Sequence, residues 1–419
     1  MINRTQQPQL VDIDGIDFVA PKKRDLSPSV PLYHMKEVPN ETARFDLYFD
    51  AGNCRGDKGI PGFTNGLLMA GTPTKTSIDI EHEINALGGF LESGVSVENA
   101  AISMYCLREY LPQILNTVVD AITHATFDEK EIAELTADRK QKWRIDLEKV
   151  STLAQQAFRA KLFASNERYA VTIVEEDFHN VSREELMAFH AKNYLKGLTK
   201  VVIVGDFEDD AIDEMAEILK PLISSEIGEF DHNVQHEAGT QIIEKKGALQ
   251  TAIRAGQMLF NKNHPDYLDF MFLNTILGDY FGSRLMTNIR EDKGYTYGIG
   301  SMIAELDGTG YFLMATEVGK EARDETIKEI NFELKRLQDE LVPEHEMQLV
   351  RNYMLGQLLK SADGAYAMTD LFLSAEIHGK TLEFYNDAIH AINEIKPERV
   401  RDLARKYLNW DEMAVVAVG

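Results

Sequence analysis

The residue types that most often perform chemistry are sparse in this sequence and poorly spaced for it. It contains neither a GxxxxGK(S/T) or GxGxxG phosphate-binding loop nor a GxSxG nucleophile motif. Glu81, His82 and Glu83 are consecutive, and because adjacent positions of a helix point apart they cannot converge on a metal. His232 and His236 have the i, i+4 spacing of a helical metal pair, but no apolar stripe accompanies them and a solvated turn is the better interpretation. These residues by themselves predict no active site.

The charge of the chain restricts the classes of partner. The 419 residues include 44 Lys and Arg against 68 Asp and Glu, a formal net charge of −24 that repels phosphate backbones and anionic lipids. No apolar run approaches the length of a bilayer span, and no secretory signal is visible in the first residues. Cys54 and Cys106 are too few for a disulfide scaffold, and Cys106 is better interpreted as a core residue than as a nucleophile. We therefore expect an acidic cytoplasmic protein whose partners are neither nucleic acids nor membranes.

The elements that would have to position any site occur twice. Ser182 and Glu185 have the spacing of a capping box, so a helix is expected to begin there, followed by a strand that ends at Gly205. Near the C-terminus a second helix, opened by Pro397, is again followed by an apolar strand, which ends at Gly419. The two glycines are 214 residues apart (419 − 205), and the helices before them end in similar sequences. The chain is therefore expected to be an internal duplication.

The local patterns indicate the fold class. Apolar and polar residues alternate from Arg44 to Asp50, which is typical of a strand with one buried face. Periodicity is lost over residues 226–239, which are interpreted as a linker. We predict an α+β fold of two homologous domains, residues 1–225 and 240–419, each a mostly antiparallel sheet flanked by helices.

Residues 51–72, AGNCRGDKGIPGFTNGLLMAGT, resemble the signature segment of the pitrilysin/insulinase family of zinc metallopeptidases, which includes mitochondrial processing peptidase. In that family a strand ending in Ala-Gly leads to a helix that carries HxxEH, and Gly-Thr follows at a fixed distance. Ala51-Gly52 and Gly71-Thr72 match this frame, and the resemblance extends over nearly the whole chain. It implies that the two domains form half of a clam-shell chamber.

The zinc motif itself is missing from this frame. Counted back from Gly71-Thr72, the two histidine positions are Gly62 and Gly66, and the glutamate position is Asn65. Two imidazoles one helical turn apart hold the metal and the carboxylate deprotonates its water, so glycines and a neutral amide can do neither. The third ligand of the family should fall near residues 139–144, a basic stretch. We expect a helix retained for packing, with Phe63 and Leu67 buried, and no zinc in this chain.

A second segment, residues 282–297, resembles the signature of the family's second domain. There an Arg and a Tyr seven residues apart face the zinc site across the chamber, and Arg290 and Tyr297 match them. The resemblance implies a guanidinium and a phenol that donate to the substrate carbonyl and its developing oxyanion. The alternative is that Arg290 pairs with the adjacent Glu291 at a helix end while Tyr297 packs in a strand, and Tyr295 is the nearest other candidate.

These features predict the non-catalytic subunit of a heterodimeric zinc metalloendopeptidase that degrades or processes peptides. A partner of the same family would bring HxxEH and the zinc, and Arg290 and Tyr297 would act in trans on its substrate. The peptide would add as a strand to a sheet edge inside the chamber. Residues 90–96 are the stretch that matches this edge in active relatives, and the alternative is that in a subunit without zinc they serve only packing. The alternative is a catalytically dead peptide-binding or scaffold protein that self-associates, so a homodimer of the isolated chain stays open.

Overall fold

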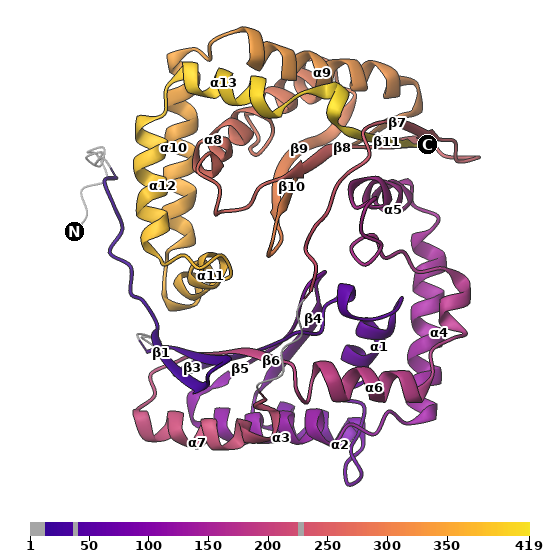
Figure 1. The fold of residues 1–419 in the computed structure, drawn as a ribbon, viewed down its shortest axis with the longest axis vertical. Coiled ribbons are helices and arrows are strands. Elements are labelled where there is room, and N and C mark those ends of the chain that lie inside the picture. The colour runs from indigo at the N-terminus through magenta and orange to yellow at the C-terminus, as the bar shows by residue number, and fades with distance from the viewer. Residues whose placement is uncertain (1–12, 37–40, 225–229) are drawn as a thin grey trace, which may run out of the picture.

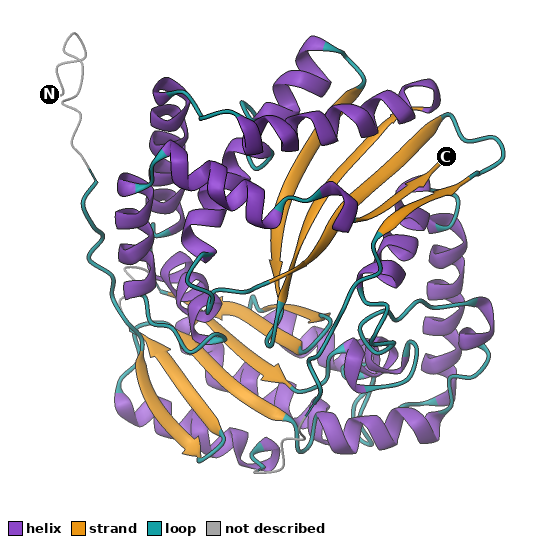
Figure 2. Cartoon of the chain, turned by 45° about the horizontal axis from the view of Figure 1, so that its top comes forward, coloured by secondary structure: helices purple, strands orange, loops and turns teal. Residues whose placement is uncertain are grey.

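The computed structural model describes residues 13–36, 41–224 and 230–419. In this part of the chain the strands form two sheets, one of six strands and one of five, and helices cover both (Figure 1 and Figure 2). The predicted linker 226–239 begins among residues 225–229, which lie outside the described residues, and the predicted domain limits stay a prediction.

The first sheet and its helices come from the first half of the chain. Its strands are β1 (Lys22–Ser27), β2 (Val30–Met35), β3 (Thr42–Phe49), β4 (Phe90–Val95), β5 (Ala100–Leu107) and β6 (Leu198–Val204). Its helices are α1 (Ile60–Leu67), α2 (Ser77–Ala86), α3 (Leu111–Thr123), α4 (Glu129–Asp146), α5 (Val150–Leu162), α6 (Arg183–Asn193) and α7 (Asp209–Leu219).

The second half contributes the other sheet. Its strands are β7 (Gly239–Ile243), β8 (Gln250–Leu259), β9 (Thr296–Glu305), β10 (Gly310–Gly319) and β11 (Ala414–Val418). Its helices are α8 (Tyr267–Leu277), the π-helical segment Met286–Asp292, α9 (Arg323–Asp339), α10 (Glu344–Ser361), α11 (Ala365–Glu376), α12 (Glu383–Glu394) and α13 (Pro397–Tyr407).

The two sheets have the same connectivity, which confirms the predicted duplication and the α+β fold. The first has the order β1-β2-β6-β3-β5-β4 and the second β7-β11-β8-β10-β9, so only β1 lacks a counterpart. In each sheet one pair is parallel, β2 with β6 and β7 with β11, and the other pairs are antiparallel. The capping box at Ser182 is formed and begins α6, as predicted. β4 and β9 are therefore equivalent edge strands.

The prediction that β3 has one buried face is wrong. Phe45 and its alternate neighbours face the helical layer, but Arg44 and Asp46 on the other face are also buried. The reason is α11 of the second half, which lies over this face; Asp370 on it is 2.6 Å from the Arg44 guanidinium. Arg44 also donates to Asp46 over 2.9 Å, so the buried charges satisfy each other.

Each half places one helix on the sheet of the other (Figure 1). α5 packs on β8 and β11 through an apolar contact, in which Phe158 and Leu162 meet Val416. α11 packs on the first sheet through an apolar cluster, in which Leu373 joins Val202 and Val204, and through polar contacts such as the hydrogen bond of 2.9 Å from Tyr33 to Glu376. This exchange fixes the two halves relative to one another.

None of the helices in the described residues is both long and apolar enough to cross a lipid bilayer.

Candidate functional site

The degenerate motif lies on α1, where the sequence places it. Gly59 precedes the helix in a left-handed conformation, φ 82°, and Pro61 stands in the first turn, where its missing N–H costs nothing. Phe63 and Leu67 point into the core of the first domain and are almost fully buried. The predicted packing helix is confirmed.

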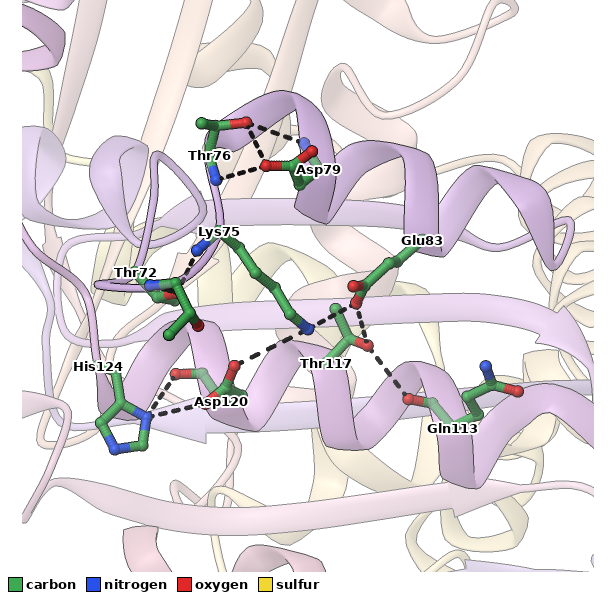
Figure 3. A network of polar contacts seen from close by, with 10 residues as sticks. Thr72, Lys75, Thr76, Asp79, Glu83, Gln113, Thr117, Asp120 and His124 are labelled. Atoms are coloured by element: carbon green, nitrogen blue, oxygen red, sulfur yellow. Dashed lines mark hydrogen bonds and ion pairs between the residues drawn. The ribbon is translucent and has the colours of Figure 1, made fainter.

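The Gly71-Thr72 pair that follows α1 opens a tight turn, in which Figure 3 shows Thr72 beside Lys75. Gly71 has a φ of 151°, and the hydroxyl of Thr72 accepts a hydrogen bond of 3.1 Å from the backbone N–H of Lys75. The ammonium group of Lys75 then bridges α2 and α3, at 2.7 Å from Glu83 and 3.9 Å from Asp120. This part of the family signature therefore shapes the turn before α2 and helps to join α2 to α3 without a metal.

Asn65 has a structural partner. It is 7% exposed, and its amide donates a hydrogen bond of 3.1 Å to the hydroxyl of Tyr194 at the end of α6. Tyr194 is fully buried, and burial raises the pKa of its phenol. Asn65 therefore joins two helices. Its neutral amide cannot accept a proton as the glutamate of the family motif does.

The two glycines of the motif face α4. Gly62 and Gly66 have no side-chain atoms, and the group opposite them is the guanidinium of Arg139. A fixed cation beside two bare helix positions does not fit a zinc ion, and the described residues contain no group of three or more His, Cys, Asp or Glu placed to hold a metal. Residues 139–144, where the third zinc ligand of the family was expected, thus place Arg139 opposite Gly62 and Gly66.

Arg290 lies on the π-helical segment and is partly exposed. Its guanidinium stacks on Phe281, with the central carbon 4.4 Å from the ring centroid, and Phe281 is itself exposed. Glu291 is 3.9 Å away, at the limit of an ion pair. Neither contact buries the guanidinium.

Side chains on α9 hold the π-helical segment. Asn288 donates hydrogen bonds of 3.0 Å to Glu329 and 2.6 Å to Glu333, and Lys293 is 3.0 Å from Glu329. Widened helical turns of this kind are frequent at functional sites. The contacts of Asn288 and Lys293 with α9 fix the backbone that carries Arg290, and the Arg290 side chain takes no part in them.

Tyr297 lies at a bulge in the edge strand β9. The pairing register shifts between Thr316 and Val318 of β10, so Glu317 lies opposite two residues, Tyr297 and Gly298. The extra residue breaks the alternation of the strand, and bulges of this type re-aim a side chain. Tyr297 is 97% exposed.

Threonine hydroxyls replace the hydrogen bonds that the bulge loses. Thr296 donates to the carbonyl of Glu317 over 2.7 Å, and Thr316 donates to the carbonyl of Gly298 over 3.0 Å. In the described part of the chain the hydroxyl of Tyr297 has no hydrogen-bond partner, whereas Tyr295 packs against the core of the second domain. The bulge is thus held rigidly while the phenol of Tyr297 stays free.

Arg290 and Tyr297 lie at the two ends of one turn. Gly294, with a φ of 65°, reverses the chain between the π-helical segment and β9, and its N–H donates to the carbonyl of Arg290 over 3.2 Å. Among the described residues no hydrogen bond or ion pair joins the two side chains. Their role on a substrate stays a prediction.

The two cysteines are not candidate nucleophiles. Cys54 and Cys106 are buried and unpaired, and burial raises the pKa of Cys54 to about 12 and that of Cys106 to about 11. The assignment of Cys106 to the core is confirmed.

Arg139 and Phe281 were not among the site residues predicted from the sequence. A signal for Arg139 was present in Gly62 and Gly66, because two glycines one turn apart lie on the same helix face and leave room for a side chain from a neighbouring helix. No comparable signal marked Phe281.

Two family models together match most of the chain. Residues 34–176 match the family described as insulinase, peptidase family M16, and residues 180–354 match the peptidase M16 inactive domain. The chain is 21% identical over 355 residues to the uncharacterized zinc protease YmxG of Bacillus subtilis, covering 84% of this chain and 86% of that protein. It is 23% identical over 412 residues to mitochondrial-processing peptidase subunit beta of Caenorhabditis elegans, covering 90% and 85%.

Solved structures agree with the fold. A peptidase M16 inactive domain from Pseudomonas fluorescens superposes with a TM-score of 0.87 at 21% identity, covering 96% of this chain and 98% of the other. A protease from Helicobacter pylori gives a TM-score of 0.82 at 15% identity, covering 96% and 100%. With two family matches in sequence order and the duplicated fold, the chain belongs to the pitrilysin/insulinase family of zinc metallopeptidases, peptidase family M16.

Proposed function

We propose that this chain is the non-catalytic subunit of a heterodimeric zinc metalloendopeptidase that degrades or processes peptides. Its partner is a chain of the same family that carries HxxEH and holds the zinc, while this chain holds none. Arg290 and Tyr297 act in trans on the peptide bound at the partner's site. The cytoplasm is the proposed compartment.

The observation that carries the proposal is the exposure of Tyr297. A tyrosine that is 97% exposed on a structured bulge stabilises the fold very little, so packing does not explain its placement. Among residues 13–36, 41–224 and 230–419 its O–H has no acceptor, and Arg290, seven residues earlier, brings a permanent positive charge. Such donors stabilise the oxyanion that forms when a peptide carbonyl is attacked.

A peptide would bind by adding a strand to an edge. β4 is at the edge of the first sheet and pairs only with β5 among the described strands, so its other side is the one to which a peptide strand would add. One relative is named as a subunit, beta, of mitochondrial-processing peptidase, and this name supports a two-chain assembly here as well.

The second candidate is a peptide-binding or scaffold protein that self-associates. It is favoured by the contacts that Arg290 already makes, with Phe281 at 4.4 Å and Glu291 at 3.9 Å. In this case the guanidinium would need no substrate.

Purification of the tagged chain from its native host separates the two candidates. We expect a roughly stoichiometric partner with HxxEH, about one zinc per pair, and peptide hydrolysis by the pair but not by this chain alone. Recovery of a homodimer without such a partner would favour the scaffold. Stoichiometric zinc in the isolated chain would contradict the interpretation of α1.

A further inference from the structure

The space between α1 and α4 contains a guanidinium packed against bare backbone. Gly62 and Gly66 are one turn apart on the same side of α1. A Cβ built on Gly62 would lie 3.1 Å from one terminal nitrogen of Arg139, and a Cβ on Gly66 would lie 2.7 Å from the other. The absence of both side chains is what allows the fork of Arg139 to lie along the helix.

Arg139 has an aromatic neighbour but no anionic one. Its central carbon is 4.7 Å from the ring centroid of Phe63, a cation–π contact. Over the described residues its guanidinium makes no hydrogen bond and no ion pair, whereas Arg144 on the same helix is 2.5 Å from Glu175. Partial burial lowers the pKa of Arg139, and no neighbouring carboxylate offsets that effect. The planar fork is thus partly desolvated with its donors unused.

Two acceptor atoms in one plane are what such a fork binds best, as in a carboxylate. α1 packs against β4, the edge strand that is open to a peptide. We propose that Arg139 binds a carboxylate of a peptide that lies along β4, either its C-terminal carboxylate or that of an Asp or Glu side chain. The site lies within the first domain and requires neither a second chain nor Arg290 and Tyr297. It rests on the part of the proposed function that places a peptide along β4, and it goes beyond that function by naming the chemical group that the peptide carries.

The test is a set of three fluorescent, unstructured peptides of one length bound to the isolated full chain. The first has a free C-terminus and no acidic residue, the second is its C-terminal amide, and the third is the amide with one internal Glu. Binding is measured by anisotropy at about 0.15 M salt, where the Debye length of about 8 Å screens the long-range field of this −24 chain. We expect one or both carboxylate peptides to bind about tenfold more tightly than the neutral amide. The peptide that does so identifies the source of the carboxylate.

Two variants locate the effect. Arg139→Met keeps an unbranched side chain over Phe63 without the charge, and it should remove the preference while leaving the affinity for the neutral amide unchanged. Arg144→Met makes the same change of net charge on the same helix and should keep the preference. Equal affinity of the wild-type chain for all three peptides overturns the proposal, and this comparison needs no variant to fold. A preference that persists in Arg139→Met overturns it too.

Discussion

The α1–α4 region of the first domain and the Arg290–Tyr297 turn of the second are the two places where the family signature predicts chemistry, and they differ in what their side chains contact. In the first region Asn65 is paired with Tyr194, and Arg139 covers the two glycines. In the second, Tyr297 is exposed and its phenol is free. In the first region the three motif positions are part of the packing of their own domain and only Arg139 keeps unused donors, whereas in the second the phenol of Tyr297 lies in solvent.

The two regions show that a residue can be present because the fold needs it or because something outside the chain needs it. A buried amide with a hydrogen bond of 3.1 Å is explained by folding, because removing its partner would leave a buried polar group unsatisfied. An exposed phenol has no such explanation, since its loss leaves nothing unpaired and uncovers almost no apolar surface. The second region therefore directs attention to a ligand or partner outside this chain.

The largest expected effect is on catalysis by the assembled pair. Tyr297→Phe or Arg290→Ala should lower turnover by about one to three orders of magnitude, because each removes a donor from the developing oxyanion. The melting temperature of the isolated chain should stay the same for Tyr297→Phe, since this side chain is 97% exposed. Steady-state kinetics of the reconstituted pair, with assembly checked by gel filtration, measure the effect.

Tyr295→Phe is the matched control for Tyr297→Phe. Tyr295 is two residues away and packs against the core of the second domain, so the loss of its hydroxyl should leave turnover unchanged. If Tyr297→Phe and Tyr295→Phe had the same turnover as the parent pair, Tyr297 would be an inherited residue without a role, and the contrast between the two regions would disappear.

A smaller effect is expected when the space between α1 and α4 is filled. Gly66→Ala should gain about 0.5–1 kcal/mol of helix propensity, but its Cβ displaces Arg139 from Phe63, a contact of about 0.5–2 kcal/mol. In the parent chain the gain in helix propensity and the loss of the Arg139–Phe63 contact nearly cancel, so Gly66→Ala should change the free energy of unfolding little. In an Arg139→Ala background the guanidinium no longer opposes the new Cβ, and only the end of the Leu135 side chain, 3.1 Å away, must shift, so Gly66→Ala should be more favourable there than in the parent chain.

Chemical denaturation of the four members of this cycle measures the coupling. Gly356→Ala is the control, because Gly356 is a helical glycine on α10 with open space around its Cβ position. It should stabilise the chain equally with and without Arg139. Additive effects of Gly66→Ala and Arg139→Ala would mean that Arg139 does not occupy the place that the structure gives it.

The sequence was informative where the signal is local. The capping box at Ser182 predicted its helix, because it depends on residues three positions apart. The burial of Arg44 was missed, since it depends on Asp370, which is more than 300 residues away and contacts it only after the two halves exchange helices. Arg139 was missed for the same kind of reason, because its place is defined by a helix about 70 residues earlier. Resemblance supplied Arg290 and Tyr297, but the bulge that exposes Tyr297 comes from the pairing of β9 with β10.

The smallest effect concerns the support of α1, and it depends on pH. His190 lies on α6 one turn before Tyr194, and at the equivalent position of the second domain, 213 residues later (407 − 194), is the apolar Leu403. Its Nε2 is 2.7 Å from the carbonyl oxygen of Ile122. Burial lowers the pKa of His190, and this outweighs the opposite influence of the carbonyl. The folded chain therefore binds this proton less readily than the unfolded chain does.

Stability should for this reason be lost as the pH falls below about 6.5, the ordinary histidine value at which the unfolded state begins to take up the proton. The loss should stop once the pH is below the lowered pKa of the folded state, because both states then carry the proton. His190→Gln keeps a donor for Ile122 but cannot titrate, so the difference in unfolding free energy between the parent and His190→Gln, followed from pH 7.5 to 5, isolates this group from the carboxylates. A difference that is independent of pH would show that His190 has the same pKa in the folded and unfolded states. The support of α1 by α6 would then be as insensitive to pH as the support of α8 by α13, where the equivalent residue is Leu403.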